Sequence, residues 1–201
     1  MTGYKDFIIH IPKKHRDTIT TESGIKIHAD HRFSSKETAN TIFNVLETPL
    51  TYSGPIKKGF FIMVDPTLVM EQQYELTGHQ ENINLVDREK NLYKVNKSFI
   101  ICYKEKIDSK WIGYDENIIV QKVNSLKTKE VKKNGLYLLE SSKPKKEKGK
   151  AKVFITNKEI ESQGVKSGNN IFIDDRFIVD IRIEGNRFSW AKNRHVLAME
   201  I

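Results

Sequence analysis

The chain repeats itself, and this duplication constrains the fold more than any other feature of the sequence. Four short segments recur in the same order, at offsets of 110, 111, 109 and 95 residues. The matched pairs are Tyr4–Ile9 with Tyr114–Ile119, Ser23–Ile27 with Asn134–Leu138, Ile56–Ile62 with Val165–Ile171, and Asn91–Tyr93 with Asn186–Phe188. Because an internal repeat indicates two copies of one structural unit, we expect two tandem domains, residues 1–108 and 109–201.

The first copy is longer than the second. The interval from Gly59 to Asn91 is 32 residues, whereas the interval from Gly168 to Asn186 is 18 residues. Glu71–Lys90 is polar, as expected of an excursion over the protein surface. We therefore place an insertion of about 14 residues at about 71–90.

Short runs of β-branched and aromatic residues, separated by turn residues, predict strands in both copies. Alternation of apolar and polar residues over Phe177–Ile183 is typical of a half-buried strand, and Glu184–Asn186 predicts a hairpin turn after it. No amphipathic helix longer than about two turns is expected. The expected strands are 7–11, 60–64, 118–123, 171–173, 177–183, 188–190 and 196–199. We therefore expect an all-β protein built from small barrels.

The composition excludes some classes of protein. Hydrophobic residues make up 38% of the 201 residues, enough for a core. The longest apolar runs, such as Phe60–Val64, have five residues, against about 20 needed to span a bilayer. The first residues lack the charged and apolar regions of a signal peptide. The single cysteine, Cys102, excludes an internal disulfide and a cysteine-cluster metal site. We expect a cytoplasmic protein with one buried thiol and no membrane contact.

Positive charge is concentrated in one segment. The net charge is +8, and Lys127–Lys152 alone holds ten Lys and three Glu. A nucleic-acid-binding face normally draws its basic residues from several elements. This segment is instead rich in Lys, Gly, Ser and Pro, which predicts a solvated, flexible loop.

The order of these motifs resembles the GroES-type co-chaperonins, the small subunits that cap chaperonin rings. In the second copy, Gly135–Leu138 resembles the Gly-hydrophobic-x-hydrophobic motif of the family, and Arg194–Met199 resembles its closing strand. Gly164–Gly168 resembles the Val-Lys-x-Gly-Asp turn of the family, with Asn169 in place of the Asp. The first copy carries the resemblance through Lys5–Ile9, Gly24–Ile27 and Lys57–Gly59.

The resemblance implies two tandem GroES-like irregular β-barrels, each with a long mobile loop that binds a GroEL-type chaperonin. It further implies self-association into a ring, and assistance to protein folding without catalysis, metal or cofactor by this chain. The implied chaperonin-binding residues are Gly24, Ile25, Lys26, Ile27, Gly135, Leu136, Tyr137 and Leu138.

Two features depart from most members of the family. The stretches Leu46–Ile56 and Phe154–Val165 look too short for the roof hairpin of the family, as in the co-chaperonins of tailed phages. Two fused domains resemble the double co-chaperonins of chloroplasts, and an even number of domains per chain cannot tile a seven-fold ring evenly.

The composition of the loops fits partner binding. Lys13–Lys36 and Ser125–Lys150 are polar, and each contains one short apolar group, which we call its apolar island: Ile25 with Ile27 in the first and Leu136–Leu139 in the second. Apolar residues isolated in a polar loop are poor core material and suit a hydrophobic groove of a partner. The alternative is that Ile25–Ile27 and Leu136–Leu139 are core strands. Early proteolytic cuts in Lys13–Lys36 and Lys127–Lys152 would favour the loop interpretation.

Other functions have weaker support. His28–His31 has the composition of a metal site but lies in the expected loop without a second ligand cluster. Asp174, Asp175 and Asp180 flank strands without a nucleophile signature, and no phosphate-binding loop or Gly-x-Ser-x-Gly occurs. Two alternatives stay open: a GroES-fold structural or assembly protein without chaperonin binding, and a basic β-barrel that binds nucleic acid. Against the latter, no aromatic residues interleave with the Lys run.

Overall fold

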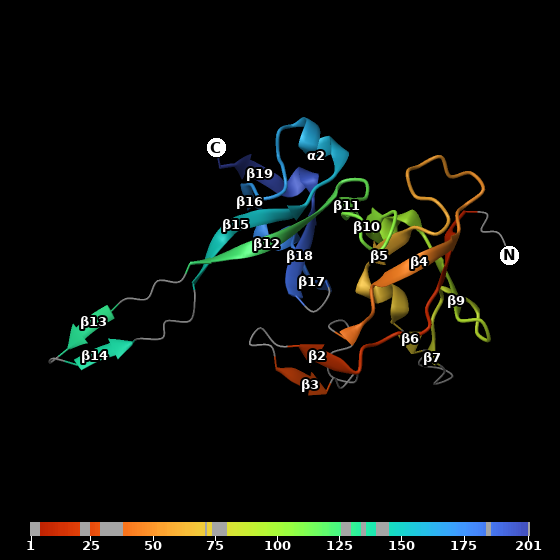
Figure 1. Ribbon diagram of the computed structural model, residues 1–201, viewed down its shortest axis with the longest axis horizontal. Coiled ribbons are helices and arrows are strands. Elements are labelled where there is room, and N and C mark those ends of the chain that lie inside the picture. The colour runs from red at the N-terminus through yellow and green to blue at the C-terminus, as the bar shows by residue number, and fades with distance from the viewer. Residues whose placement is uncertain are drawn as a thin grey trace.

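The computed structural model describes residues 5–20, 25–28, 38–70, 72–73, 80–125, 130–133, 136–139, 145–183 and 186–200. The fold is mostly β, with two large antiparallel sheets side by side and three small two-stranded sheets (Figure 1). The all-β expectation is therefore confirmed. Within these residues, no helix has the length and apolar character needed to cross a membrane.

The N-terminal sheet has seven strands in the order β11-β10-β5-β4-β1-β9-β8. Its strands are β1 (Phe7–His10), β4 (Ile42–Glu47), β5 (Phe61–Val64), β8 (Leu85–Asp87), β9 (Leu92–Val95), β10 (Ile100–Lys104) and β11 (Ile112–Gly113). Two 3-10 helices, η1 (Pro66–Val69) and η2 (Lys97–Phe99), connect strands. The expected insertion region contains a further hairpin of β6 (Gln72–Gln73) and β7 (Gln80–Glu81).

The C-terminal sheet has six strands in the order β17-β18-β12-β15-β16-β19. Its strands are β12 (Asn117–Ser125), β15 (Lys145–Ile155), β16 (Asn170–Ile173), β17 (Val179–Ile183), β18 (Asn186–Lys192) and β19 (Val196–Met199). The connecting helices are α2 (Lys158–Ser162), η3 (Asp175–Phe177) and η4 (Asn193–His195).

The two sheets share one topology. Without β11, the N-terminal order β10-β5-β4-β1-β9-β8 matches the C-terminal order β19-β16-β15-β12-β18-β17 strand for strand. The 3-10 helices also match, since η1 and η3 follow β5 and β16, whereas η2 and η4 precede β10 and β19. This agreement in pairing is a structural counterpart of the sequence repeat.

The core-facing residues of β1 and β12 show that the sequence match between these two strands is displaced by one residue. Phe7 and Ile9 point into the core of the N-terminal sheet, whereas Ile118 and Val120 point into the core of the C-terminal sheet. Alternate residues of a strand face opposite sides, so a core-facing residue of β1 must match a core-facing residue of β12. Ile9, which pairs with Val45 on β4, then corresponds to Val120, which pairs with Val153 on β15. The sequence alignment of Tyr4–Ile9 with Tyr114–Ile119 placed Ile9 opposite Ile119 instead.

Each sheet has its own hydrophobic core, and a third cluster joins the two sheets. The third cluster contains Met63, Ile101 and Cys102 from the N-terminal sheet, together with Ile119, Ile155, Ile181, Ile183 and Phe188 from the C-terminal sheet. Trp111 and Trp190 pack against this cluster. Cys102 is free and buried. β11 lies in the range expected for the second domain, yet it pairs with β10 of the N-terminal sheet.

The segments before β5 and β16 are fully described and contain no hairpin. Between β4 and β5 the chain forms turns and no strand, and between β15 and β16 it forms only α2. The N–H of Ile160 donates to Asn157 Oδ1 at 3.0 Å and so caps α2. The expected strand 177–183 begins two residues later than predicted, at Val179, because Phe177 belongs to η3 and Ile178 follows as its C-cap. The side chain of Asp174 accepts the N–H of Arg176 and so caps the start of η3.

Candidate partner-binding hairpins

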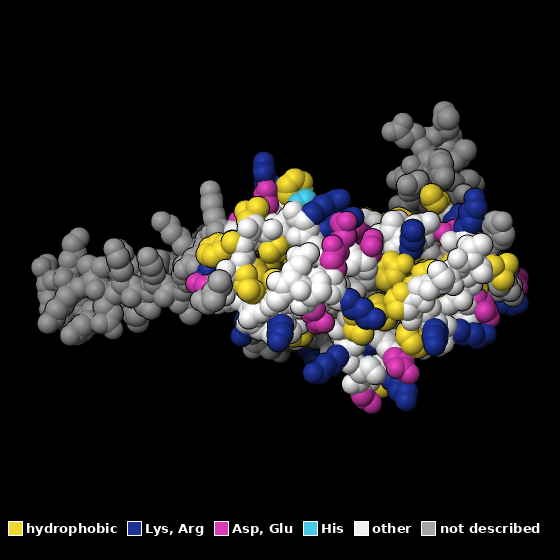
Figure 2. All heavy atoms as spheres, turned by 90° about the horizontal axis from the view of Figure 1, so that it is seen from above, with side chains coloured by type: hydrophobic (Ala, Val, Ile, Leu, Met, Phe, Trp, Pro, Cys, Tyr) yellow, Lys and Arg dark blue, Asp and Glu magenta, His cyan; other side chains and the backbone are white. Residues whose placement is uncertain are grey.

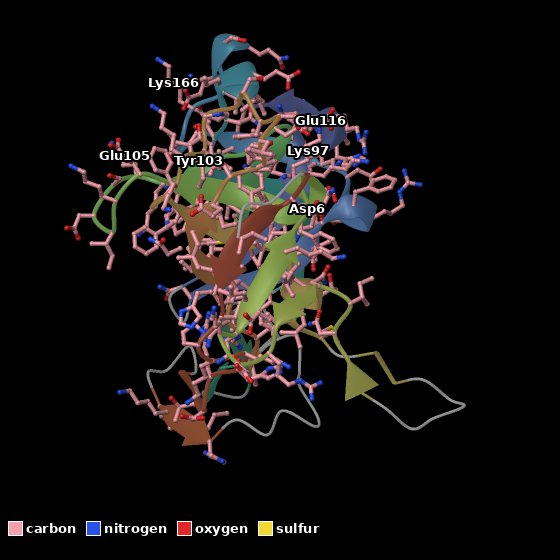
Figure 3. All side chains as sticks on the ribbon, turned by 90° about the vertical axis from the view of Figure 1, so that its right-hand side faces the viewer. Asp6, Lys97, Tyr103, Glu105, Glu116 and Lys166 are labelled. Atoms are coloured by element: carbon pink, nitrogen blue, oxygen red, sulfur yellow. The ribbon has the colours of Figure 1, made fainter. Side chains whose placement is uncertain are left out.

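Both long polar loops contain a hairpin that lies outside the two large sheets. β2 (Thr18–Thr20) pairs with β3 (Lys26–His28) between β1 and β4. β13 (Glu130–Lys133) pairs with β14 (Leu136–Leu139) between β12 and β15. Figures 1 and 3 show the β2–β3 hairpin below the large sheets, and Figure 1 shows the β13–β14 hairpin well away from them. The two hairpins occupy equivalent places in the topology.

The predicted binding residues fall at the start of or on the second strand of each hairpin. Ile25 directly precedes β3, which begins at Lys26 and contains Ile27; Leu136, Tyr137 and Leu138 lie on β14. Gly24 and Gly135 lie outside the described residues. Sequence reasoning missed the first strands, β2 and β13. The signal for β2 was present in Thr18-Ile19-Thr20, three consecutive β-branched residues.

The apolar residues of the first hairpin are exposed. Ile25 has an exposed fraction of 62% and Ile27 of 47%, whereas Ile9 in the adjoining sheet is fully buried. The alternative that Ile25–Ile27 forms a core strand is therefore wrong. Among the residues that the structure describes, β14 pairs only with β13 and joins neither large sheet. The first hairpin thus presents two large aliphatic side chains to solvent, an arrangement that suits an apolar partner groove.

The first hairpin has a firmly held base. Arg16 N–H donates to the Thr38 carbonyl at 2.8 Å, and Asn40 N–H donates to the Lys14 carbonyl at 2.8 Å. The amide side chain of Asn40 also donates to the Lys13 carbonyl at 2.8 Å. Thr38 is fully buried. These hydrogen bonds tie the chain that enters the loop, at Lys13–Arg16, to the chain that leaves it, at Thr38–Asn40.

The second hairpin leaves from a long strand pair. β12 and β15 pair as far as Ser125 with Lys145, so residues 145–152 of the expected loop belong to a strand. The expectation of a flexible loop across Lys127–Lys152 is therefore wrong for this part. From Ala151 onward the reason is the alternation of Ala151, Val153 and Ile155, which are buried between exposed neighbours; before it, the strand is held by pairing with β12 and β16. Long-range pairing, with this pattern at its C-terminal end, outweighs the lysine-rich composition.

The base of the first hairpin lies close to the C-terminal sheet. Burial lowers the pKa of Arg16, and the nearby positive charge of Arg182 on β17 lowers it further. A pocket of about 250 Å³ opens between the sheets in the same region. It is lined by Asp65, Pro66 and Thr67 from the N-terminal sheet side and by Val179, Asp180, Ile181, Arg182 and Arg187 from β17 and β18.

The candidate carboxylates are bound to neighbouring residues. Arg176 donates hydrogen bonds to Asp174 and holds its pKa at about 2. Burial would raise the pKa of Asp180, but hydrogen bonds from Ser189 and Lys122 lower it. Asp175 accepts the N–H of Gly149 at 2.9 Å. Each of the three aspartates therefore has a hydrogen-bond partner within the folded chain.

The His28–His31 motif, which has the composition of a metal site, is described only at its first residue. His28 is exposed on β3, whereas residues 29–31 of the metal-like motif lie outside the described part. Within the described ranges, no three His, Cys, Asp or Glu residues come together as a metal site. The β2–β3 hairpin is the candidate site because Ile25 and Ile27 are exposed on it, and the β13–β14 hairpin is its equivalent in the topology.

No protein-family model matches the chain, and no curated protein matches it.

Proposed function

We propose that this chain is a tandem co-chaperonin of the GroES type, formed by two irregular β-barrels with one binding hairpin each. It caps a GroEL-type chaperonin ring in the cytoplasm and assists ATP-dependent folding by that partner. The observation that carries the proposal is the exposure of Ile25 and Ile27 on a projecting hairpin, with an equivalent hairpin at Leu136–Leu139. The chain itself supplies no catalysis and needs no cofactor for this task.

The energetics favour several weak contacts made together. Burying two aliphatic side chains contributes about 3–6 kcal/mol. Ordering each loop residue costs about 1–2 kcal/mol, so a single loop binds weakly. Two hairpins on one chain, and more in a ring, raise the effective concentration of the later contacts. The pairing already present in each hairpin lowers the ordering cost, because part of the loop is held before it binds.

Nucleotide-dependent binding to a GroEL-type chaperonin ring tests the proposal. The variants are the double substitution Ile25→Ser with Ile27→Ser, the double substitution Leu136→Ser with Leu138→Ser, and both together. Leu50→Ser is the matched control, because Leu50 is 68% exposed and lies outside both hairpins. We expect each double variant to weaken binding at least tenfold and the control to bind like the wild type. Undiminished binding by the combined variant would contradict the role of the hairpins.

The nucleic-acid alternative has less support. Lys58, Lys122 and Lys150 form ion pairs with Glu47, Asp180 and Glu200. On the face seen in Figure 2, basic side chains are scattered among acidic and apolar ones, without one continuous basic field. Binding to single-stranded DNA with a steep dependence on salt would favour this alternative. Neither DNA nor chaperonin binding would favour a GroES-fold assembly protein.

A further inference from the structure

The pocket of about 250 Å³ between the two sheets has one wall from each half of the chain. The N-terminal wall is the start of η1, with Asp65 just before it, and the C-terminal wall is β17 together with Arg187 on β18. Figure 1 shows β17 on the side of the C-terminal sheet that faces the N-terminal sheet. Small ligands bind preferentially in concave sites where two structural units meet.

Two arginines stand directly opposite each other at this pocket. Arg182 on β17 pairs with Arg187 on β18, and both residues line the pocket. Directly opposed residues of antiparallel strands have their side chains on one face of the sheet, with Cβ atoms about 5 Å apart. Like charges in this arrangement repel each other and destabilise the strand pair. An anion placed between the two guanidinium groups would turn this repulsion into attraction.

Arg16, at the base of the β2–β3 hairpin, brings a third guanidinium group to the same region. The residue is half-buried, and its Nε donates to Asn40 Oδ1 at 3.4 Å. Burial lowers the pKa of Arg16, and the charge of Arg182 lowers it further. A lowered guanidinium pKa means that the surroundings disfavour the positive charge, and a nearby anion would have the opposite effect.

The two carboxylates that line the pocket are hydrogen-bonded to other groups. Asp180 accepts hydrogen bonds from Lys122 at 2.9 Å and from Ser189 at 2.7 Å. Asp65 accepts the N–H of Thr67 at 2.8 Å and the hydroxyl of Thr67 at 2.7 Å. Among the described residues around the pocket, these two carboxylates stand against Lys122 and three arginines, so positive charge prevails there.

Apolar side chains form the rest of the pocket wall. Pro66 and Ile181 are buried, whereas Val179 is 45% exposed. Covering the exposed apolar surface of Val179 is favourable only for a ligand that has an apolar group of its own. The pocket therefore combines a cationic end, at Arg182 and Arg187, with an apolar wall.

We propose that this pocket binds a small phosphate monoester, with the phosphate group on Arg182 and Arg187 and the organic group against Val179 and Pro66. The forked N–H donors of a guanidinium match the oxygens of a phosphate in a bidentate manner. A phosphate monoester carries close to two negative charges at neutral pH, enough for two guanidinium groups, whereas a carboxylate carries one. Because each sheet supplies one wall, the bound ligand links the two halves of the chain.

Isothermal titration calorimetry with phenyl phosphate at low ionic strength tests the site. We expect Arg182→Gln and Arg187→Gln each to weaken binding about tenfold or more, the effect of losing a hydrogen bond to a charged group. Arg88→Gln is the matched control, because Arg88 is exposed, does not line the pocket and carries the same charge. Arg187 is also exposed, so its replacement should leave the fold intact, which circular dichroism checks. Wild-type affinity in Arg187→Gln, or no binding of phenyl phosphate by the wild type, would overturn the proposal.

Two further probes identify the chemistry of the ligand. Inorganic phosphate has the charge without the organic group, and benzoate has the ring with a single charge. We expect the wild type to bind phenyl phosphate more tightly than either probe. Equal affinity for inorganic phosphate would overturn the assignment of an ester, and equal affinity for benzoate would overturn the assignment of a phosphate. Val179→Glu, which places a carboxylate on the apolar wall, should weaken phenyl phosphate binding, whereas Leu50→Glu, at an exposed residue outside the pocket, should not.

Phosphate ester binding is independent of chaperonin binding. The double variant Ile25→Ser with Ile27→Ser should bind phenyl phosphate like the wild type, because neither residue lines the pocket. Loss of chaperonin binding in that variant concerns the hairpins, whereas loss of phenyl phosphate binding in Arg187→Gln concerns the pocket. The two experiments therefore fail separately.

Discussion

Gly59 and Gly168 occupy the same turn in the two sheets and adopt the same backbone conformation, with φ of 86° and 96°. Each glycine N–H donates to a valine carbonyl at 2.8 Å, Val45 in one sheet and Val153 in the other. The same valines donate their own N–H groups to Phe60 and Asn169 at 2.8 and 2.9 Å. The turn that leads into β5 and β16 is therefore conserved between the halves in its hydrogen bonds, although the sequences around it differ.

We expect Gly59→Ala and Gly168→Ala to destabilise the protein by similar amounts. A Cβ at either position meets no atom within 4 Å, so the cost is backbone strain alone, about 1–2 kcal/mol. Urea unfolding measures it. Lys57→Ala and Lys166→Ala are the controls, because both side chains are exposed two residues earlier in the same turn and should change the free energy of unfolding by less than about 0.5 kcal/mol. An equal loss in controls and glycine variants would contradict the strain argument.

The first hairpin should contribute little to stability. Ile25→Ser with Ile27→Ser should change the free energy of unfolding by no more than about 0.5 kcal/mol per site, since both residues are exposed. Ile9→Ala, at a fully buried position, should cost about 2–5 kcal/mol because it leaves a cavity. Thermal and urea unfolding of the variants provide the comparison. A large loss from the hairpin variant would show that its apolar side chains are packed in the native protein.

Trypsin should cleave slowly after Lys152. This residue pairs with Gln121 on β12 and with Asn170 on β16, so its backbone is held on both sides. Lys106 lies in the exposed turn after β10 and serves as the reference, which should be cleaved sooner. Mass spectrometry of timed digests gives the order of the cuts. Early cleavage after Lys152 would contradict the extension of β15 through this residue.

The Cys102 thiol should stay unreactive in the folded protein. Burial raises the pKa of Cys102 far above its usual range, and Lys104 only partly opposes this effect. A thiol reagent at pH 8 should therefore react with Cys102 only after denaturant is added. Rapid reaction of the native protein would place the thiol at the surface.

The same burial makes stability fall at alkaline pH. The thiol of the unfolded chain loses its proton from about pH 8.5 upward, whereas the buried thiol of the folded chain keeps it. Ionisation therefore stabilises the unfolded state, and the free energy of unfolding falls as the pH rises. The contribution of the protonated Cys102 thiol to the free energy of unfolding is complete below about pH 8.5 and is lost as the pH rises above it. We expect Cys102→Ala to be less stable at neutral pH and to lose less stability between pH 8 and pH 10 than the wild type. An unchanged slope in urea unfolding would contradict this assignment.

Much of the strand framework could be predicted from local pattern. The segments 7–11, 60–64, 171–173 and 196–199 each contain or match an observed strand to within one residue at either end, because alternation and β-branched residues act within a few positions. The lysine-rich segment was predicted less well. Its composition indicated a loop, but pairing of β15 with β12 and β16 holds residues 145–152 in the sheet, and such pairing involves partners far along the chain.

The candidate site was predictable in position and not in form. The apolar islands at Ile25–Ile27 and Leu136–Leu139 stood out against polar neighbours in the sequence. Their pairing into the β2–β3 and β13–β14 hairpins did not, because β2 and β13 have only three and four residues and a short strand does not specify its partner. Exposure of Ile25 depends on what surrounds it in space, and local sequence does not specify those surroundings.

By itself, the sequence determined that the chain is rich in strands and that its motifs recur in one order, since both follow from residue types at short spacing. Only the tertiary structure decided which equivalent faces are covered. Met63 on β5 and Ile101 on β10 are buried at the junction, whereas Phe172 and Leu197, on the matching strands β16 and β19, are exposed. All four are apolar strand residues. Their exposures differ because the N-terminal sheet packs against the C-terminal sheet at β5 and β10, whereas the C-terminal sheet ends at an open edge at β19.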